Sequence, residues 1–339
     1  MMDSTEVVAQ LGLGAEYTAW VRMLSEVGQP PDGLPDLSPD DLATVGMEPQ
    51  DQPDIVAAIQ DVFATPQWRW LLERAYHAVQ RDVGDTENMR PMPNLPVELG
   101  TNATCFWIVV FLCAVRDIRH WHQTQGVPDD ISMDTLADLG RHTRLYRQRN
   151  GRTGLDTQWW ISLAFRGGLF GIGRLQYAPY HLLTGPAGPL FWYDDATAAS
   201  RGPGFRRGDP VVGLHIPDSG PLTPSVCVDS FARARAFFRE HVPGYADGVV
   251  TCTSWLLDEQ LQQYLEPDSN IVQFQRRFEL VPGTRDSDAS AFHFVFGRTP
   301  DALDQLQPQT RLERAIVEHV KTGGHWRLRT GWLRLSEQT

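Results

Sequence analysis

The amino-acid sequence predicts an α+β protein, with an all-helical N-terminal domain followed by a mixed β-sheet domain flanked by helices. Up to about residue 137, apolar residues recur at helical spacing and strand signals are few. After Gly167 and Gly168, short apolar strands are interspersed with helices, as in a layered fold with one mixed sheet. A chain of 339 residues is long enough for two domains. We place them at residues 1–131 and 132–339.

The composition limits the class of partner. A net charge of −12 argues against nucleic acid as the main partner. The four cysteines lie far apart with no CxxC pair, which favours reduced thiols, a cytoplasmic location and no metal site. The N-terminus lacks the basic and apolar regions of a signal peptide. The most apolar run, Cys105–Val115, is only about half as long as a bilayer span and predicts a buried helix. We therefore expect a small-molecule acceptor and no membrane partner, while an oligomer remains possible.

The predicted helices of the first half follow from apolar spacing and from start and stop residues. Ser38-Pro39-Asp40-Asp41 is typical of a helix start, and the prolines of Met89–Pro96 predict an irregular connector. Gly151 ends a helix whose last turns are rich in arginine. The expected helical ranges are 5–27, a helix after Ser38, 52–64, 67–80, 99–123, 132–150 and 155–166.

The second half is expected to alternate between strands and helices. Residues 194–210 are rich in Gly, Pro, Ser and Arg and predict a loop. Thr223-Pro224 predicts the start of a helix. The expected strands are 169–183, 190–193, 211–216, 248–256, 271–281, 291–296 and 326–335, and the remaining helices are 258–265 and 312–321.

The order of elements from Ser132 resembles the core of the GNAT superfamily of acyltransferases. The sequence is also similar to an actinobacterial group of acyltransferase-like proteins with a helical N-terminal domain and a GNAT-like C-terminal domain. The likeness covers most of the chain and is carried by Gly151–Trp160, Gly173–Tyr177, Gly213–Pro217, Thr253–Leu257 and Ser269–Phe278. It implies an N-acyltransferase that uses acetyl-CoA or another acyl-CoA as co-substrate, with no metal.

The resemblance implies a donor site where Val211–Pro217 runs into the helix after Thr223. A helix N-terminus attracts a pyrophosphate, and glycine allows close approach of the backbone. The family's Arg/Gln-x-x-Gly-x-Gly/Ala turn is replaced here by Asp218–Pro224, which keeps a single glycine. An ordinary strand–turn–helix with a threonine cap is the alternative. The candidate donor-binding residues are Leu214, Ile216, Ser219, Gly220, Leu222, Thr223, Asn270 and Phe274.

The candidate catalytic residues are His215, Cys252 and Tyr264. In GNAT folds, the strands that carry His215 and Cys252 separate around the acyl chain, so the two side chains would form a nucleophile–base pair if they faced each other. A polar core histidine and a buried, inert thiol are the alternatives, and the second is favoured for Cys252. Phe274 stands roughly where many family members have the tyrosine that protonates the leaving thiolate. Tyr264 is the nearest replacement.

The candidate acceptor residues are Asp156, Trp159, Trp160 and His142, because this region lines the acceptor side in GNAT folds. An acid and two indoles are able to bind an amine, although a helix cap with core aromatics is the favoured interpretation. Arg141–Arg152 holds five arginines, which suit either an adenosine phosphate or a solvated face.

Three functions are compatible with these residues. The first is direct attack of an amine on an acyl-CoA thioester, with no covalent enzyme intermediate. The second is a Cys–His acyl carrier or hydrolase that uses Cys252. The third is a non-catalytic protein that binds a small molecule on a degenerate GNAT fold.

Overall fold

The computed structural model describes residues 3–184, 188–189, 191–246, 248–300 and 302–338. It forms two compact units, residues 1–170 (unit 1) and 171–339 (unit 2). The division lies later than the one that we place after residue 131, because the helices Asp129–Leu136 and Gln158–Phe165 pack on the long helix Thr101–Thr124 of unit 1. Leu155, for example, donates its backbone N–H to the carbonyl of Thr104 in that helix at 3.0 Å.

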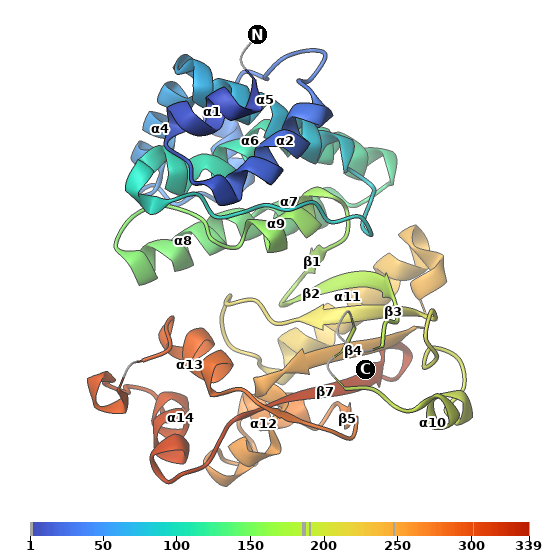
Figure 1. Ribbon diagram of the computed structural model, residues 1–339. Coiled ribbons are helices and arrows are strands. Elements are labelled where there is room, and N and C mark those ends of the chain that lie inside the picture. The colour runs from blue at the N-terminus through green and yellow to red at the C-terminus, as the bar shows by residue number, and fades with distance from the viewer. Residues whose placement is uncertain (1–2, 185–187, 190, 247, 301, 339) are drawn as a thin grey trace. The chain divides into compact units, whose positions relative to one another are not determined.

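Unit 1 is helical, as its apolar spacing predicts (Figure 1). The Ser38 start is confirmed by a capping box with Asp41. The helix expected over 132–150 consists of two helices that meet at Ala137. The α-helices are α1 (Ser4–Leu11), α2 (Thr18–Val27), α3 (Pro39–Thr44), α4 (Gln52–Ala64), α5 (Pro66–Arg81), α6 (Thr101–Thr124), α7 (Asp129–Leu136), α8 (Asp138–Asn150) and α9 (Gln158–Phe165).

Helix α6 forms the centre of unit 1. Its middle is apolar on all sides, and Phe111 packs on Phe165 of α9 with ring centroids 4.7 Å apart. Among the described residues, α6 is the helix long and apolar enough to cross a membrane, but 78 % of its most apolar window is buried inside the protein. Such burial is expected of a core helix.

Unit 2 is built on a mixed sheet with the order β1-β2-β3-β4-β7-β5, and β6 pairs with β7 (Figure 1). β3 is antiparallel to β2 and parallel to β4, and β4 is antiparallel to β7. The single strand expected over 169–183 is instead two strands, because Gly173, with φ of 65°, turns the chain between them. The strands are β1 (Phe170–Ile172), β2 (Leu175–His181), β3 (Pro210–His215), β4 (Val249–Ser254), β5 (Glu279–Leu280), β6 (Arg285–Asp286) and β7 (Arg327–Arg334).

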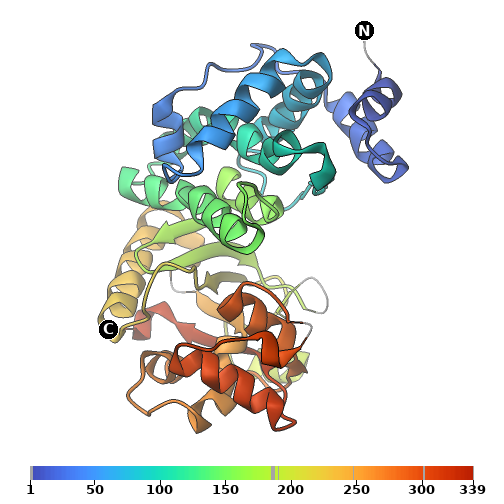
Figure 2. The ribbon, with the colours of Figure 1, turned by 90° about the vertical axis from the view of Figure 1, so that its left-hand side faces the viewer.

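The helices of unit 2 are α10 (Asp195–Ser200), α11 (Pro224–His241), α12 (Asn270–Gln275), α13 (Asp288–Phe296) and α14 (Arg311–Lys321). The helix expected after Thr223 is confirmed as α11. The helix expected over 258–265 is a 3-10 helix over Glu259–Gln263. Helices α13 and α14 pack against each other (Figure 2).

Further sequence expectations for unit 2 are wrong. Residues 271–281 begin as α12, because the Ser269 side chain accepts the N–H of Val272 and caps a helix. Residues 291–296 belong to α13, which ends at Gly297 in the left-handed conformation. The loop expected over 194–210 contains α10, capped by Asp194. In the strand expected over 190–193, residue 190 lies outside the described residues and 191–193 are irregular.

Candidate functional site

The parallel strands β3 and β4 are paired over only part of their length. Their register runs from Val211 with Val249 to Gly213 with Thr251 and ends there. On its other edge β3 stays paired with β2 as far as His215, and β4 stays paired with β7 as far as Ser254. The facing edges of 214–215 and 252–254 are therefore not paired with each other. An extended ligand is able to lie between two strand edges that part in this way.

His215, Gly213 and Tyr180 lie on one face of this sheet, which we call the His215 face. Side chains alternate along a strand, and paired residues point to the same side. A Cβ placed on Gly213 would lie 3.3 Å from His215 Nε2 and 3.3 Å from Tyr180 Cε1. The imidazole and the phenol ring are therefore neighbours above the bare backbone of Gly213.

A hydroxyl pair continues the polar part of this face. The Tyr180 hydroxyl and Thr251 Oγ1 form a hydrogen bond of 2.8 Å. Burial raises the pKa of Tyr180, against a smaller opposite effect of the bond to Thr251. The phenol therefore stays protonated at neutral pH and is able to donate a proton or a hydrogen bond.

Gln176 completes the His215 face. It is paired with His215 in register, its side chain is 3 % exposed, and its Nε2 has no hydrogen-bond partner among the described residues. The sequence analysis missed both Gln176 and Tyr180. The signal that would have revealed them is their even spacing along one strand, which places both on one face once the turn at Gly173-Arg174 is recognised.

Cys252 points to the opposite face, which we call the α11 face, because it follows Thr251 in β4. Tyr177 on this face bonds to Ser230 Oγ of α11 at 2.9 Å. Cys252 is 2 % exposed, and burial raises the pKa of its thiol to about 12. The predicted pair of Cys252 and His215 is therefore not formed, and the thiol lacks the lowered pKa of a nucleophile.

The loop between β3 and α11 is held by Arg174. Its guanidinium donates to the carbonyls of Pro217 at 2.9 Å, Gly220 at 2.6 Å and Pro221 at 3.3 Å. Gly220 has a φ of 115°, which side-chain-bearing residues rarely adopt. With three carbonyls turned toward Arg174, this glycine-containing loop leads directly into the positive end of α11 at Thr223.

Two cations lie near the first turn of α11. Burial raises the pKa of the Cys227 thiol, and the positive charges of Arg277 and Arg174 oppose this rise. Both guanidinium groups are thus close enough to act on a residue one turn into the helix. Together with the helix dipole they favour an anion at this end.

The other candidate donor residues occupy α12 and the segment before it. Asn270 is the first residue of α12, and Phe274 is 2 % exposed and packs on Phe278 at 5.1 Å between ring centroids. The Tyr264 hydroxyl bonds to His319 Nδ1 at 3.1 Å. Tyr264 packs on a hydrophobic cluster around Trp326 that contains neither His215 nor Cys252.

In unit 1, two of the four candidate acceptor residues converge on the buried carboxylate of Asp138. Trp160 Nε1 donates to Asp138 Oδ2 at 3.1 Å, and His142 Nε2 lies 3.7 Å from the same oxygen. His142 Nδ1 is 2.8 Å from Thr157 Oγ1. Burial lowers the pKa of His142, although the Asp138 charge opposes this. Its imidazole is therefore neutral at pH 7.

The other two candidate acceptor residues lie beside this group. Asp156 pairs with Arg149 at 2.9 Å and does not cap a helix. Trp159 is 57 % exposed and meets Trp160 edge-on, with ring centroids 5.9 Å apart. Unit 1 thus presents an open indole next to a neutral imidazole and a buried acid.

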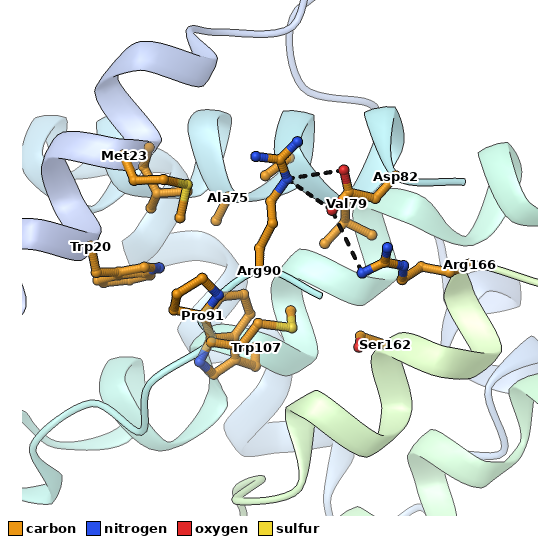
Figure 3. Close-up of a pocket in the computed structure, with 13 residues that line it drawn as sticks. Trp20, Met23, Ala75, Val79, Asp82, Arg90, Pro91, Trp107, Ser162 and Arg166 are labelled. Atoms are coloured by element: carbon orange, nitrogen blue, oxygen red, sulfur yellow. Dashed lines mark hydrogen bonds and ion pairs between the residues drawn. The ribbon is translucent and has the colours of Figure 1, made fainter. Parts of the chain in front are cut away.

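A separate pocket of unit 1 has an empty volume of about 380 Å³, counting its open mouth (Figure 3). Arg90 lines it and binds Asp82 through Nε at 2.9 Å, and Arg166 lies 3.8 Å from the same carboxylate. None of the candidate site residues lines this pocket. It is lined by Trp20, Met23, Leu24, Ala75, Ala78, Val79, Asp82, Arg90, Pro91, Met92, Trp107, Ser162 and Arg166. Among the described residues, no three His, Cys, Asp or Glu side chains are grouped as metal ligands.

Comparison with known families gives two adjoining matches. Residues 38–167 match an N-acyltransferase N-terminal domain, and residues 169–333 match a GNAT-like C-terminal domain. The two matches meet close to the division between the compact units. A comparison with curated proteins gave no match.

Solved structures of acyltransferases resemble the whole chain. One, in complex with decanoyl-CoA and teicoplanin, is 36 % identical with a TM-score of 0.85, over 98 % of this chain and 100 % of that chain. A second, in complex with CoA and 10C-teicoplanin, gives the same values. A tryptophan-to-alanine mutant in complex with octanoyl-CoA is 35 % identical with a TM-score of 0.84, over 98 % of this chain and 99 % of that chain.

Proposed function

This chain belongs to the acyltransferases that join an N-acyltransferase N-terminal domain to a GNAT-like C-terminal domain, and we propose that it transfers an acyl group from acyl-CoA to an amine. The observation that carries the proposal is the end of β3–β4 pairing at Gly213 and Thr251, beside His215. Two strand edges that stop pairing with each other next to a histidine provide both a place for an extended donor and a base for its reaction.

The donor is proposed to lie with its pantetheine arm between 214–216 and 252–254, which are not paired with each other. Its pyrophosphate then reaches the loop Ser219–Thr223 and the N-terminus of α11. The carbonyl contacts of Arg174 keep this loop in place, and Arg174 and Arg277 add positive charge. Asn270 and Phe274 of α12 are the proposed contacts farther along the arm.

The chemistry of the His215 face is a direct transfer. His215 takes a proton from the acceptor amine, whose nitrogen attacks the thioester carbon. The C–N bond forms, the C–S bond breaks, and the thiolate of CoA leaves with the electron pair and receives a proton. We assign that proton to Tyr180 in place of Tyr264, because Tyr180 lies next to His215 whereas the Tyr264 hydroxyl is engaged by His319.

The acceptor is proposed to be an amine with a large aromatic body. Trp159 offers an exposed indole for stacking, and the neutral His142 beside Asp138 is able to accept a hydrogen bond. The relatives in complex with teicoplanin and 10C-teicoplanin support an acceptor of this kind, with a medium-length acyl chain on the donor.

Thermal unfolding with decanoyl-CoA tests the donor. A ligand at 100 times its Kd stabilises the folded state by about 2.7 kcal/mol, so the Tm of the full chain is expected to rise by about 5 °C or more. Arg174→Ala releases the loop carbonyls, and the Kd for decanoyl-CoA is expected to rise about tenfold, or 1.4 kcal/mol. Arg239→Ala is the matched control, because it removes the same charge from the last turn of α11. An unchanged wild-type Tm at millimolar decanoyl-CoA rules out the donor.

A mass-spectrometric assay with decanoyl-CoA and a panel of amines, including teicoplanin, tests the transfer. A product heavier by one decanoyl group is expected from at least one amine. Phe274, in place of the family's acid tyrosine, favours a second candidate function, which is ligand binding without catalysis. Binding of decanoyl-CoA with no acylated product from any amine would support that alternative.

A further inference from the structure

We propose that the side-chain amide of Gln176 is a catalytic hydrogen-bond donor that holds the carbonyl oxygen of the acyl group during transfer. This inference rests on the proposed function, because it requires an acyl donor beside His215. It assigns a role to a residue for which the fold alone has no use.

The first observation is that the side-chain amide of Gln176 is buried and that its Nε2 lacks a hydrogen bond. Its side chain is 3 % exposed, and Nε2 has no hydrogen-bond partner among the described residues. A buried donor without a partner destabilises the folded state, so it calls for an explanation, and a ligand that accepts its hydrogen bond is one.

A structural glutamine in the same unit shows the contrast. Gln275 is 6 % exposed, and its Nε2 donates to the carbonyls of Leu256 at 2.8 Å and Asp258 at 2.9 Å. Its amide joins two backbone segments, which accounts for its burial. Gln176 makes no comparable bond, so a structural role does not account for it.

The second observation is its position. Gln176 is paired with His215 in the antiparallel register of β2 and β3, so both side chains point to the same face from neighbouring strands. The imidazole of His215 lies over Gly213, where β3 ends its pairing with β4. A base and an amide donor therefore stand side by side where the donor's reactive end is proposed to lie.

The chemistry of the transfer is favoured by such a donor. When the amine nitrogen bonds to the thioester carbon, the carbonyl oxygen gains negative charge until the C–S bond breaks. An amide N–H that is shielded from water stabilises this charge more strongly than water does. Rotation about the last side-chain torsion of Gln176 exchanges the positions of Oε1 and Nε2. The N–H donor is therefore able to occupy either position.

The experiment separates catalysis from stability in one set of variants. Gln176→Leu removes the donor but keeps the side-chain volume, so kcat is expected to fall by about 10²–10³. KM for decanoyl-CoA is expected to change by less than about threefold, and the Tm is expected not to fall, since no bond is lost. Gln275→Leu is the matched control, because it breaks two hydrogen bonds and is expected to lower the Tm.

A spectroscopic measurement reports on the contact itself. Decanoyl-CoA labelled with ¹³C at its carbonyl is bound to each protein without acceptor, and the carbonyl stretch is recorded in the infrared. The wild type is expected to shift this band to lower frequency, and Gln176→Leu to abolish the shift.

The outcomes distinguish failure of the proposed function from failure of the role of Gln176 alone. If the wild type does not bind decanoyl-CoA, the proposed function fails and the role of Gln176 fails with it. If the wild type binds and Gln176→Leu keeps the shifted band, the role of Gln176 alone is overturned. That role is also overturned if Gln176→Leu retains kcat, or if it lowers the Tm as much as Gln275→Leu does.

Discussion

The two faces of the unit 2 sheet carry similar polar side chains. The hydrogen bonds of these side chains are complete on one face and incomplete on the other. Tyr177 and Tyr180 both belong to β2, and burial raises the pKa of both. On the α11 face, Tyr177 bonds to Ser230, which donates in turn to the carbonyl of Ile172 at 2.5 Å. On the His215 face, Tyr180 bonds to Thr251 next to a histidine and an amide with an unpaired Nε2.

The comparison shows that burial and a raised pKa do not by themselves identify a reactive group. A series of hydrogen bonds that ends on a backbone carbonyl, such as the one from Tyr177 through Ser230, leaves no donor unpaired and holds the helix on the sheet. A polar face with an unpaired buried donor has capacity left for a ligand. We therefore propose that the reactive face is the one whose hydrogen bonds are incomplete, and that the buried thiol on the other face is part of the packing.

The largest expected effect is at His215. His215→Ala removes the proposed base, and kcat/KM for acyl transfer is expected to fall by about 10²–10⁴. The rise in Tm with decanoyl-CoA is expected to persist, because the histidine acts on the acceptor amine and the donor is held elsewhere. Wild-type kcat/KM in this variant would contradict the role of His215 as the base. The His215 face would then have no functional difference from the α11 face.

The helices of unit 1 and the strands β3, β4 and β7 of unit 2 could be predicted because their signals are local. Helix α4 has the bounds that apolar spacing gave for 52–64, and α11 begins where Thr223-Pro224 predicted. Helices α12 and α13 were mistaken for strands, because Ile, Val and Phe fit either element and only a capping contact such as that of Ser269 decides between them.

The face that each side chain occupies could not be predicted, because it depends on register. A shift of one residue moves a whole strand's side chains to the other face. His215 and Cys252 were placed on neighbouring strands correctly, yet the pairing of Gly213 with Thr251 turns them to opposite faces. Gln176 escaped notice because the strand expected over 169–183 concealed the turn at Gly173, and the alternation could not be followed from there.

The tyrosines of β2 provide a matched pair of variants with the next largest effect. Tyr180→Phe removes the proposed proton donor. Since a thiolate is a good leaving group that needs little assistance, kcat/KM is expected to fall by only about ten- to a hundredfold.

Tyr177→Phe is the control on the α11 face. It removes one hydrogen bond and is expected to cost about 1 kcal/mol of unfolding free energy with kcat/KM unchanged. Steady-state kinetics measure kcat/KM, and urea unfolding measures stability, for both Tyr180→Phe and Tyr177→Phe. Equal kinetic losses in the two variants would contradict the assignment of separate roles to the faces.

Gly213→Ala probes the spacing on the His215 face with a single added carbon. The new Cβ would lie 3.3 Å from both His215 and Tyr180, so the two rings must move by a few tenths of an ångström. A misplacement of 1 Å costs up to about 10²-fold, so a three- to tenfold loss of kcat is expected, with little change in Tm. An Ala178→Gly change on the paired position removes a carbon from the same face and serves as the opposite perturbation. A Gly213→Ala protein with full kcat would show that the two rings do not act together.

The smallest expected effect is at Cys252, and it is the most direct test of the α11 face. With a pKa of about 12, this thiol is almost entirely protonated at pH 7.5, and thiolate appears only as the pH approaches 12. Iodoacetamide is therefore expected to leave Cys252 unlabelled in the native protein at pH 7.5 and to label it after unfolding, as followed by peptide mass spectrometry. Cys252→Ala is expected to keep kcat/KM and to cost about 1 kcal/mol of stability through the cavity it leaves. Rapid labelling with loss of activity would instead restore the Cys–His hypothesis, which requires a thiolate on the His215 face, where the register of β3 and β4 does not place it.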